Sequence, residues 1–487
     1  MSSPDSAFIP DPRRWRILAV LTAALFMSLI GVSIVNVAIP SIQHGLGATE
    51  SELQWVLSGY ALTFGIGLVA AGRAGDVYGR GPLFIAGTLV FTSASIASGL
   101  AQDPLTLNIA RALQGVGSGL LTPQGVGAIQ QYFRGAERAR AFGIFGAAVG
   151  VSVAIGPVLG GFLIDLFGPE TGWRWTFLVN VPVGIVTIVL AFLWFPKPML
   201  NKNRELDPSI PEQSKDLDPV GAILLGLAVF IVLLPFVESG AHPALWLCLP
   251  VGLGLIGVWL WWEQRQKRRG RSPMVDLEIF RTPSFANGSL LITLYFMGMT
   301  SIWVLVALYL QEGLGHSAMA AGAVGIPSAL ASTFAALWGG RNVPKYGRIV
   351  VIGGMYSVLI GVSSSIAVAW LRAGGHISEW WLILTLTFVG IGQGTVISPN
   401  QSLTLADVPL KYAGSSGGIM QTGQRIGASV GIALITALAF WVLSHTNWTI
   451  AFIAGFGGVF ATILASLAFA YKDLVQRRGM EDPTHLG

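Results

Sequence analysis

The sequence predicts an all-α integral membrane protein whose chain crosses the bilayer fourteen times. Of its 487 residues, 53% are hydrophobic and only 11% are charged, and the mean hydropathy is +0.66. A soluble core of this size cannot bury so much apolar surface. The lipid bilayer is therefore the expected surroundings of most of the chain.

Fourteen windows contain the roughly 17–25 predominantly apolar residues that a membrane-spanning helix needs. They are residues 17–39, 53–71, 83–100, 105–132, 141–167, 175–195, 220–237, 245–262, 285–310, 320–338, 349–371, 380–406, 413–443 and 448–470. The N-terminal "MSSPDSAFIPDPRRWR" has no short apolar core followed by a cleavage site, so we expect a retained tail and not a signal peptide. Cys248 is the single cysteine, and no Cys or His spacing is typical of a metal or haem site. We expect no metal and no cofactor.

The distribution of Lys and Arg orients these windows. If both termini are cytoplasmic, all but four of the 29 basic residues fall in cytoplasmic segments. The exceptions are Arg111, Arg174, Arg372 and Arg425. Because cytoplasmic loops collect positive charge, we expect a multi-pass protein of the plasma membrane, the inner membrane of a bacterium, with both termini cytoplasmic. This topology explains the basic composition, so nucleic acid is not an expected partner.

Two long polar connections, 196–219 and 263–284, divide the chain and flank the seventh and eighth windows. Six windows remain on each side. The expected units are an N-terminal six-helix bundle (residues 1–195), a linker with two additional transmembrane helices (196–284) and a C-terminal six-helix bundle (285–487).

The two halves repeat each other. The segment "GRAGDVYGR" at 72–80 returns as "GRNVPKYGR" at 340–348, and "GVGSGLLTPQ" at 115–124 returns more loosely as "GIGQGTVISPN" at 390–400. Transporters with a midplane site between two moving halves are built from such repeats. One chain holds both halves, so we expect a monomer.

Five motifs occur in a characteristic order. They are "VNVAIP" at 35–40, "GRAGDVYGR" at 72–80, "RALQGVGSG" at 111–119, "GPVLGG" at 156–161 and "WRWTFLVNVPVG" at 173–184. With them the chain resembles the major facilitator superfamily, in its fourteen-helix drug:proton antiporter branch, over essentially its whole length. The resemblance implies the major facilitator fold, with an inserted two-helix hairpin. It also implies export of hydrophobic drugs or metabolites in exchange for protons by alternating access.

The loop motif after the second window predicts a cytoplasmic lock. Its candidate residues are Gly72, Asp76, Gly79 and Arg80. Glycines permit a tight turn, and Asp76 and Arg80 are placed to pair with each other or with helix ends of the opposite half. The alternative is that they only fix the topology. Val77 and Gly81 stand where the family usually has basic residues, which predicts a weaker lock.

The fifth window carries the antiporter motif of the family. Its residues are Gly156, Pro157, Gly160 and Gly161. Small residues let helices approach closely in a membrane, and proline bends a helix. The functional interpretation is a smooth helix that slides against the other half, and the alternative is passive packing.

Two arginines lie inside predicted spans, where a charge is costly and usually faces a cavity or a partner. Arg111 is close enough to a helix end that it could instead extend to the interface. Arg425 lies deep in the thirteenth window. We expect both to be buried charges with a role in coupling, and a structural role for Arg425 is an equal alternative.

The first window lacks the acid that the family usually has there. Aligning "VNVAIP" places Gly31 at the position of the acid and Ser33 at the position of a threonine. The resemblance implies that this acid acts in proton coupling near the buried arginine. Other acids of the spans lie at helix ends predicted to be outside, namely Asp165, Glu238, Glu312 and Glu379. Two arginines without a deep carboxylate predict a net positive cavity that favours neutral or anionic cargo.

Three functions compete on this evidence. The first is a proton-coupled exporter of hydrophobic small molecules, and the second is a transporter of anionic or lipid-like amphiphiles with altered coupling. The third is a membrane sensor or assembly protein that has lost transport. An enzyme is not expected, because no nucleophile–base set or cofactor loop is evident. Candidate cavity residues, chosen by helix position, are Ser33, Asn36, Gln54, Tyr60, Gln124, Tyr295, Trp303 and Gln421.

Overall fold

The computed structural model describes residues 11–168, 170–197, 217–237 and 243–481. The first ten residues, most of the connection 196–219, and Glu238 lie outside the described residues.

The described chain is built of helices, and no β-strand occurs in these ranges. The helices are α1 (Arg14–Leu46), α2 (Glu50–Tyr78), α3 (Arg80–Leu100), α4 (Pro104–Tyr132), α5 (Gly135–Phe167), α6 (Gly172–Leu178), α7 (Asn180–Trp194), α8 (Pro219–Val237), α9 (Cys248–Arg268), α10 (Pro283–Leu308), α11 (Ala318–Ala323), α12 (Gly325–Tyr346), α13 (Arg348–Ala373), α14 (Leu382–Thr404), α15 (Ala413–Leu443) and α16 (Trp448–Glu481). Each predicted window corresponds to one helix or to two consecutive ones, so the predicted all-α fold class is confirmed.

Thirteen described spans are long and apolar enough to cross a membrane. The fourth window, α4, is not among them because it carries Arg111, several glutamines and many glycines. It is nevertheless 29 residues long, and its exposed large side chains recur every three or four residues, which is one face of a helix. These side chains are Leu105, Ile109, Leu113 and Val116. We therefore count α4 as the fourteenth span.

The repeated loop motifs form equivalent turns between helices. Gly79 ends α2 with φ 104°, and Arg80 begins α3. Gly347 ends α12 with φ 53°, and Arg348 begins α13. Both glycines have a positive φ that favours glycine over other residues, which explains why the motif keeps a glycine at this point in both halves.

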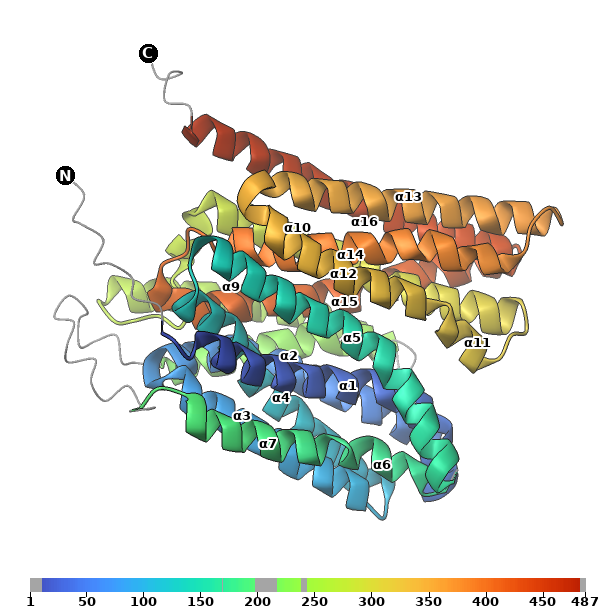
Figure 1. The fold of residues 1–487 in the computed structure, drawn as a ribbon, viewed down its shortest axis with the longest axis horizontal. Helices are drawn as coiled ribbons and strands as arrows, with labels where there is room; N and C mark the ends of the chain where they lie inside the picture. Colours follow the sequence, from blue (N-terminus) through green and yellow to red (C-terminus); the bar gives the residue numbers. More distant parts are fainter. Residues whose placement is uncertain (1–10, 169, 198–216, 238–242, 482–487) are drawn as a thin grey trace.

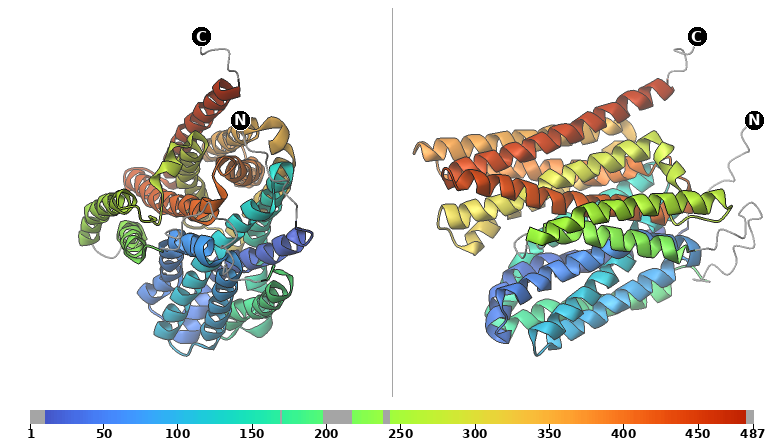
Figure 2. Two further views of the ribbon diagram at one scale, coloured as in Figure 1. Left: turned by 90° about the vertical axis from the view of Figure 1, so that its left-hand side faces the viewer. Right: turned by 180° about the vertical axis from the view of Figure 1, so that it is seen from behind.

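The helices pack in two groups. In the first, α2 and α3 pack on α4, α1 packs on α5, and α7 packs on α3. In the second, α12 and α13 pack on α14, and α15 and α16 pack on α10. The pair α8 and α9 lies at the side of the molecule (Figure 2, left), where α8 contacts α2 and α15.

The groups meet most closely at one end of the molecule, on the left in Figure 1, where α1 begins and α16 ends. We call this the basic end, because the α2–α3 and α12–α13 turns with Arg80 and Arg348 lie there. The largest hydrophobic cluster crosses between the groups at this end, joining Val126 and Phe142 of the first to Val343 and Met420 of the second.

Candidate functional site

Asp76 joins the two halves at the basic end. Its carboxylate accepts hydrogen bonds from the backbone N–H groups of Gly414 and Ser415, at 2.9 and 3.0 Å, and from the Ser415 hydroxyl at 3.2 Å. These N–H groups belong to the first turn of α15, where a helix has unsatisfied donors and the positive end of its dipole. Arg80 Nη2 also donates to Asp76 at 2.7 Å. The structure therefore brings the predicted Asp76–Arg80 pair together and adds a helix end of the opposite half, and we name this arrangement the Asp76–α15 contact.

The backbones of α2 and α15 approach closely beside Asp76. A Cβ on Gly72 would overlap the carbonyl group of Gly414. One turn further along α15, a Cβ on Gly418 would lie 2.6 Å from the carbonyl oxygen of Leu68. Small residues permit this approach, so the predicted lock residue Gly72 has a steric reason to be glycine.

The C-terminal copy of the loop motif does not repeat this contact. Pro344 stands where the first copy has Asp76. Arg348 is buried and bonds within its own half, to Asp473 Oδ2 at 2.6 Å and to the side chain of Asn400. The Asp76–α15 contact is therefore one-sided, from the N-terminal half to the C-terminal half.

Arg111 lies inside the N-terminal half and is 1% exposed. Its Nε donates to the Val56 carbonyl oxygen at 2.9 Å, and its Nη1 donates to Gln114 Oε1 at 2.8 Å and to the Gly31 carbonyl oxygen at 3.4 Å. Its Cζ lies 4.4 Å from the centre of the Tyr60 ring. The side chain does not extend to the interface, which was the alternative from the sequence. These partners of the guanidinium are all neutral.

A polar network surrounds this arginine. The Tyr60 hydroxyl and Ser28 Oγ each lie 2.7 Å from Ser118 Oγ, and Gln114 Nε2 donates to Ser95 Oγ at 2.6 Å. The network links α1, α2, α3 and α4. Because buried polar groups need partners, it holds Tyr60 in a fixed position beneath the guanidinium.

Arg425 reaches the same region from α15. Its Cζ lies 4.2 Å from the centre of the Phe64 ring, and the Phe64 and Tyr60 rings are 5.9 Å apart in a T-shaped arrangement. No hydrogen bond or ion pair with another described residue reaches its guanidinium. We name Arg111, Tyr60, Phe64 and Arg425 the arginine–aromatic cluster. It contains one arginine from each half and, among the described residues, no carboxylate.

The close approaches between α2 and α15, at Gly72, Gly414 and Gly418, lie between the basic end and the cluster. Beyond Arg425, Gly427 and Gly431 of α15 pack on Thr293 and Met297 of α10, in their own half. The halves thus contact each other from the basic end as far as the cluster. A site at the cluster is closed from the basic end by the Asp76–α15 contact.

Gly31 lies against Arg111, because its carbonyl oxygen accepts a hydrogen bond from Arg111 Nη1 at 3.4 Å. A Cβ on Gly31 would lie 3.2 Å from Phe91 Cζ and 3.9 Å from Asn180 Nδ2. That Nδ2 is buried and has no hydrogen-bond partner among the described residues. A side chain at Gly31 would therefore fit tightly against the Phe91 ring, with an unused donor beside it.

The other candidate cavity residues are dispersed. Gln421, one turn before Arg425, is 9% exposed, and its Oε1 has no partner among described residues. Asn36 and Gln54 are exposed on α1 and α2. Tyr295 is fully buried within α10.

Three of these candidates have local structural contacts instead. Ser33 donates to the Ser152 carbonyl oxygen at 3.1 Å, in the seam between α1 and α5. Gln124 donates to the Ala71 carbonyl oxygen at 2.8 Å. Trp303 packs beside Gly325, 3.3 Å from the point where a Cβ would be. The position of a residue along its helix does not by itself show whether the residue lies at a contact between helices, as these three do, or faces a cavity.

The glycines of the α5 antiporter motif pack within the N-terminal half. Cβ atoms on Gly156 and Gly160 would meet Ser33 and Ile34 of α1, within the N-terminal half, and Gly161 has nothing within 4 Å. The motif does not face the other half, because α5 crosses α12 nearer the basic end, at Gly143 and Gly150. Pro157 lies between the two packing glycines.

Several residues of this region were missed from the sequence. They are Ser28, Phe64, Ser95, Gln114 and Ser118 of the cluster region, and Gly414 and Ser415 at the start of α15. Gln114 and Ser118 follow Arg111 by three and seven residues, which is one helical face. That spacing could have identified them as its neighbours.

Comparisons with known proteins identify the family. Residues 21–432 match the family described as Major Facilitator Superfamily. The protein named "Probable actinorhodin transporter" of Streptomyces coelicolor is 35% identical over 440 residues, covering 89% of this chain and 74% of that relative. The "Puromycin resistance protein pur8" of Streptomyces alboniger is 29% identical over 454 residues, covering 92% and 85%.

A solved structure shares the fold. The structure of the human organic anion transporter MFSD10 aligns with a TM-score of 0.68 over 94% of this chain and 100% of that chain. The identity is 13%, so this likeness concerns the fold alone. Together with the family match, the helices and the similar transporters, it leads to one conclusion: the chain belongs to the Major Facilitator Superfamily and is a multi-pass membrane transporter.

Proposed function

We propose that this transporter exports hydrophobic small molecules in exchange for protons by alternating access. One observation carries the proposal: an arginine from each half meets the Tyr60–Phe64 pair between the halves, further from the basic end than the Asp76–α15 contact. A site between halves that is closed at one end is what an alternating-access transporter needs. We assign the chain no enzymatic activity.

The proposal includes an orientation. The basic end is cytoplasmic, in agreement with the distribution of Lys and Arg, and both termini lie on that side of a bacterial plasma membrane. The division into bundles 1–195 and 285–487 with the inserted pair in 196–284 is retained, and one chain functions as a monomer. The Asp76–α15 contact then closes the cytoplasmic side.

The cargo is proposed to be an antibiotic-like or metabolite molecule. Support comes from the names of the relatives, which refer to actinorhodin and puromycin. The cluster offers aromatic rings for apolar contact and guanidinium groups for polar recognition.

The proton is carried by a carboxylate outside the cluster, since the described part of the cluster has none. Asp165 and Glu312, which are exposed, and Glu379, which pairs with His316 at 3.0 Å, are candidates.

A second candidate function is the transport of anionic or lipid-like amphiphiles with altered coupling. The observation that favours it is Arg425, whose guanidinium contacts the Phe64 ring and receives no carboxylate from the described residues. A positive group of this kind attracts an anion and repels a cation.

The test is uptake into inverted vesicles with and without an imposed proton gradient. Thermal stabilisation of the purified protein by a compound library first selects cargo. Gradient-dependent uptake of neutral hydrophobic compounds, absent from vesicles without the protein, supports the first function. Uptake of anionic amphiphiles that is equal with and without the proton gradient supports the second function. Stabilisation without any uptake contradicts both.

Asp76→Asn is expected to slow transport about tenfold without weakening cargo binding. Asparagine retains one acceptor for the α15 N–H groups but loses the charge, and a charged group at a helix N-terminus stabilises by about 0.3–2 kcal/mol. Transport rate and cargo affinity are measured in parallel on the purified variant. Asp407→Asn, an exposed carboxylate at the same end, is the matched control. Weaker binding with an unchanged rate contradicts the assignment of Asp76 to the contact between halves.

A further inference from the structure

The inserted helix pair carries two buried carboxyl groups at its basic end. Glu263 lies near the end of α9 and is 1% exposed, and Asp218 lies just before α8 and is 2% exposed. Asp218 Oδ2 and Glu263 Oε1 lie 2.5 and 2.7 Å from the point that a Cβ on Gly221 would occupy. The two groups therefore face each other across this glycine.

Their hydrogen bonds differ. Asp218 accepts from the Gly221 N–H and from Trp262 Nε1, both at 3.0 Å. Glu263 Oε2 accepts from the Val275 N–H at 3.3 Å, and the Trp259 side chain and the Met274 backbone also interact with this carboxyl group, whereas no hydrogen bond from a described residue reaches its Oε1. A buried carboxylate oxygen without a donor is costly, and two carboxylates that share a site do not both ionise readily. A proton on Glu263 removes both costs, because the resulting O–H can donate towards Asp218.

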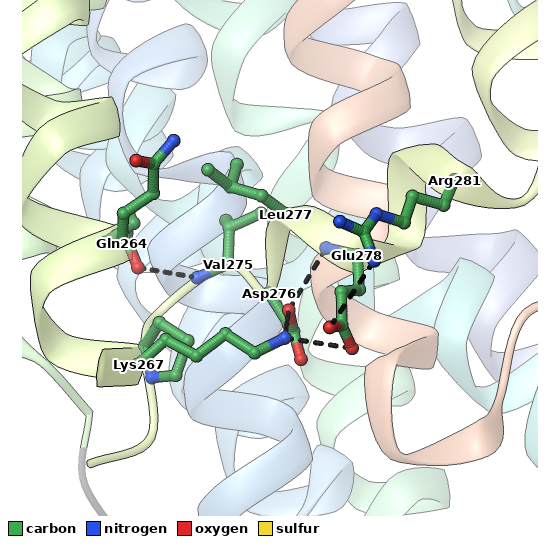
Figure 3. Close-up of a pocket in the computed structure, with 9 residues that line it drawn as sticks. Gln264, Lys267, Val275, Asp276, Leu277, Glu278 and Arg281 are labelled. Carbon is green, nitrogen blue, oxygen red and sulfur yellow. Dashed lines mark hydrogen bonds and ion pairs between the residues drawn. The ribbon is translucent and has the colours of Figure 1, made fainter. Parts of the chain in front are cut away.

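Nearby cations are engaged elsewhere. Lys267, one turn after Glu263, pairs with Asp276 at 2.7 Å and with Glu278 at 2.9 Å (Figure 3), and Arg281 lies 4.0 Å from Glu278. From α2, the charge of Arg73 acts on Tyr412. On α9 itself, Arg265 Cζ lies 4.9 Å from the centre of the Trp261 ring, and Arg268, Arg269 and Arg271 at its end are exposed. None of the described ion pairs includes Glu263.

We propose that Glu263 and Asp218 form a proton-binding site, in which Glu263 binds one proton and shares it with Asp218. A pocket of about 220 Å³ gives the proton a route to water. It is lined by Glu263 together with Lys267, Glu278 and Arg281, whose side chains are 41%, 59% and 85% exposed. Protons exchange with the solution at the basic end through this opening.

The site is connected to the start of α15. Val275, which bonds Glu263, is followed by Asp276, and Asp276 Oδ2 accepts from the Tyr412 hydroxyl at 2.8 Å. Tyr412 directly precedes α15, whose first N–H groups bind Asp76. Burial and the Asp276 carboxylate raise the pKa of the Tyr412 hydroxyl, so it remains a donor at neutral pH.

Loss of the proton from Glu263 acts on α15 through the same contacts of Val275, Asp276 and Tyr412. It leaves two negative charges side by side at Gly221, displaces the Val275–Asp276 segment and weakens the Asp76–α15 contact. The proton site stands independently of the proposed function, and only its effect on opening rests on alternating access.

Infrared difference spectroscopy of the purified protein in lipid nanodiscs tests the site directly, without any cargo. The wild type is expected to show the C=O band of a protonated carboxyl group that disappears on alkalinisation. Glu263→Gln, which matches the protonated side chain in shape, removes the band, and Asp407→Asn retains it. Asp218→Asn moves its disappearance to lower pH, because a neighbouring negative charge is lost. An unchanged band in Glu263→Gln overturns the proposal.

The connection to α15 is tested separately. Tyr78 and Tyr346 are exposed at equivalent positions of the basic end, 48% and 42% respectively. Spin labels at Tyr78→Cys and Tyr346→Cys, in a Cys248→Ser background, report the separation of the halves. The wild-type distance is expected to increase at alkaline pH and the Glu263→Gln distance to stay short. A distance that responds to pH equally in both overturns the connection.

Discussion

Arg111→Ala is expected to lower transport about 100-fold while the protein still reaches the membrane in near-normal amounts. Hydrogen bonds to a charged group contribute about 1.5–3 kcal/mol each, and about 3 kcal/mol corresponds to a 100-fold change in rate. Arg111 donates to Val56, Gln114 and Gly31. Two of these acceptors, Val56 and Gly31, are backbone carbonyl oxygens within helices. They can also accept hydrogen bonds inside their own helices, so removing the arginine leaves few polar atoms without a partner.

The measurement is initial uptake into vesicles that contain equal amounts of each variant. Arg174→Ala is the control, because Arg174 also donates to backbone carbonyl groups but lies at the end opposite the basic end. Transport by Arg111→Ala at the rate of the control would show that the buried charge only stabilises the fold.

Gly31→Asp is expected to change cargo preference towards cations by about tenfold, which corresponds to about 1.4 kcal/mol. The new carboxylate lies beside the unpartnered Asn180 Nδ2 and adds a negative charge next to Arg111, whose partners are neutral. Gly31→Ala is the matched control, since it adds a Cβ without the charge, and this Cβ requires only a small shift of the Phe91 ring, which lies 3.2 Å away. We expect that variant to transport nearly normally.

Uptake of a cationic and a neutral dye, with and without a proton gradient, separates electrostatics from packing. If both Gly31 variants fold poorly, the glycine serves close packing. If Gly31→Asp folds well and keeps its cargo preference and pH dependence, the missing acid does not explain how this transporter differs from relatives that have one.

Local chemistry made much of the fold predictable. Thirteen described spans follow from apolar length, and the glycine-containing turns at Gly79 and Gly347 follow from the repeated motif. The sequence offered Asp76 either Arg80 or a helix end as its partner, and the structure uses both. A carboxylate has several acceptor positions, so the two possibilities did not exclude each other.

Long-range contacts were not predictable in the same way. The stacking of Arg425 on Phe64 joins residues of different halves, and no periodicity within one helix specifies it. Gly156 and Gly160 signalled close packing, but the identity of the partner helix depends on where α5 crosses its neighbours. Glu263 directly follows an apolar window, where the sequence predicts a polar linker, but the fold buries it.

The distance between spin labels at Tyr78→Cys and Tyr346→Cys tests the central claim most directly, namely that the Asp76–α15 contact holds the basic end closed. The labels are compared in the Cys248→Ser background with Asp76 intact and with Asp76→Asn, in nanodiscs at neutral pH. The account predicts a predominantly short distance that lengthens when Asp76 loses its charge. Equal distance distributions in the two proteins would contradict it.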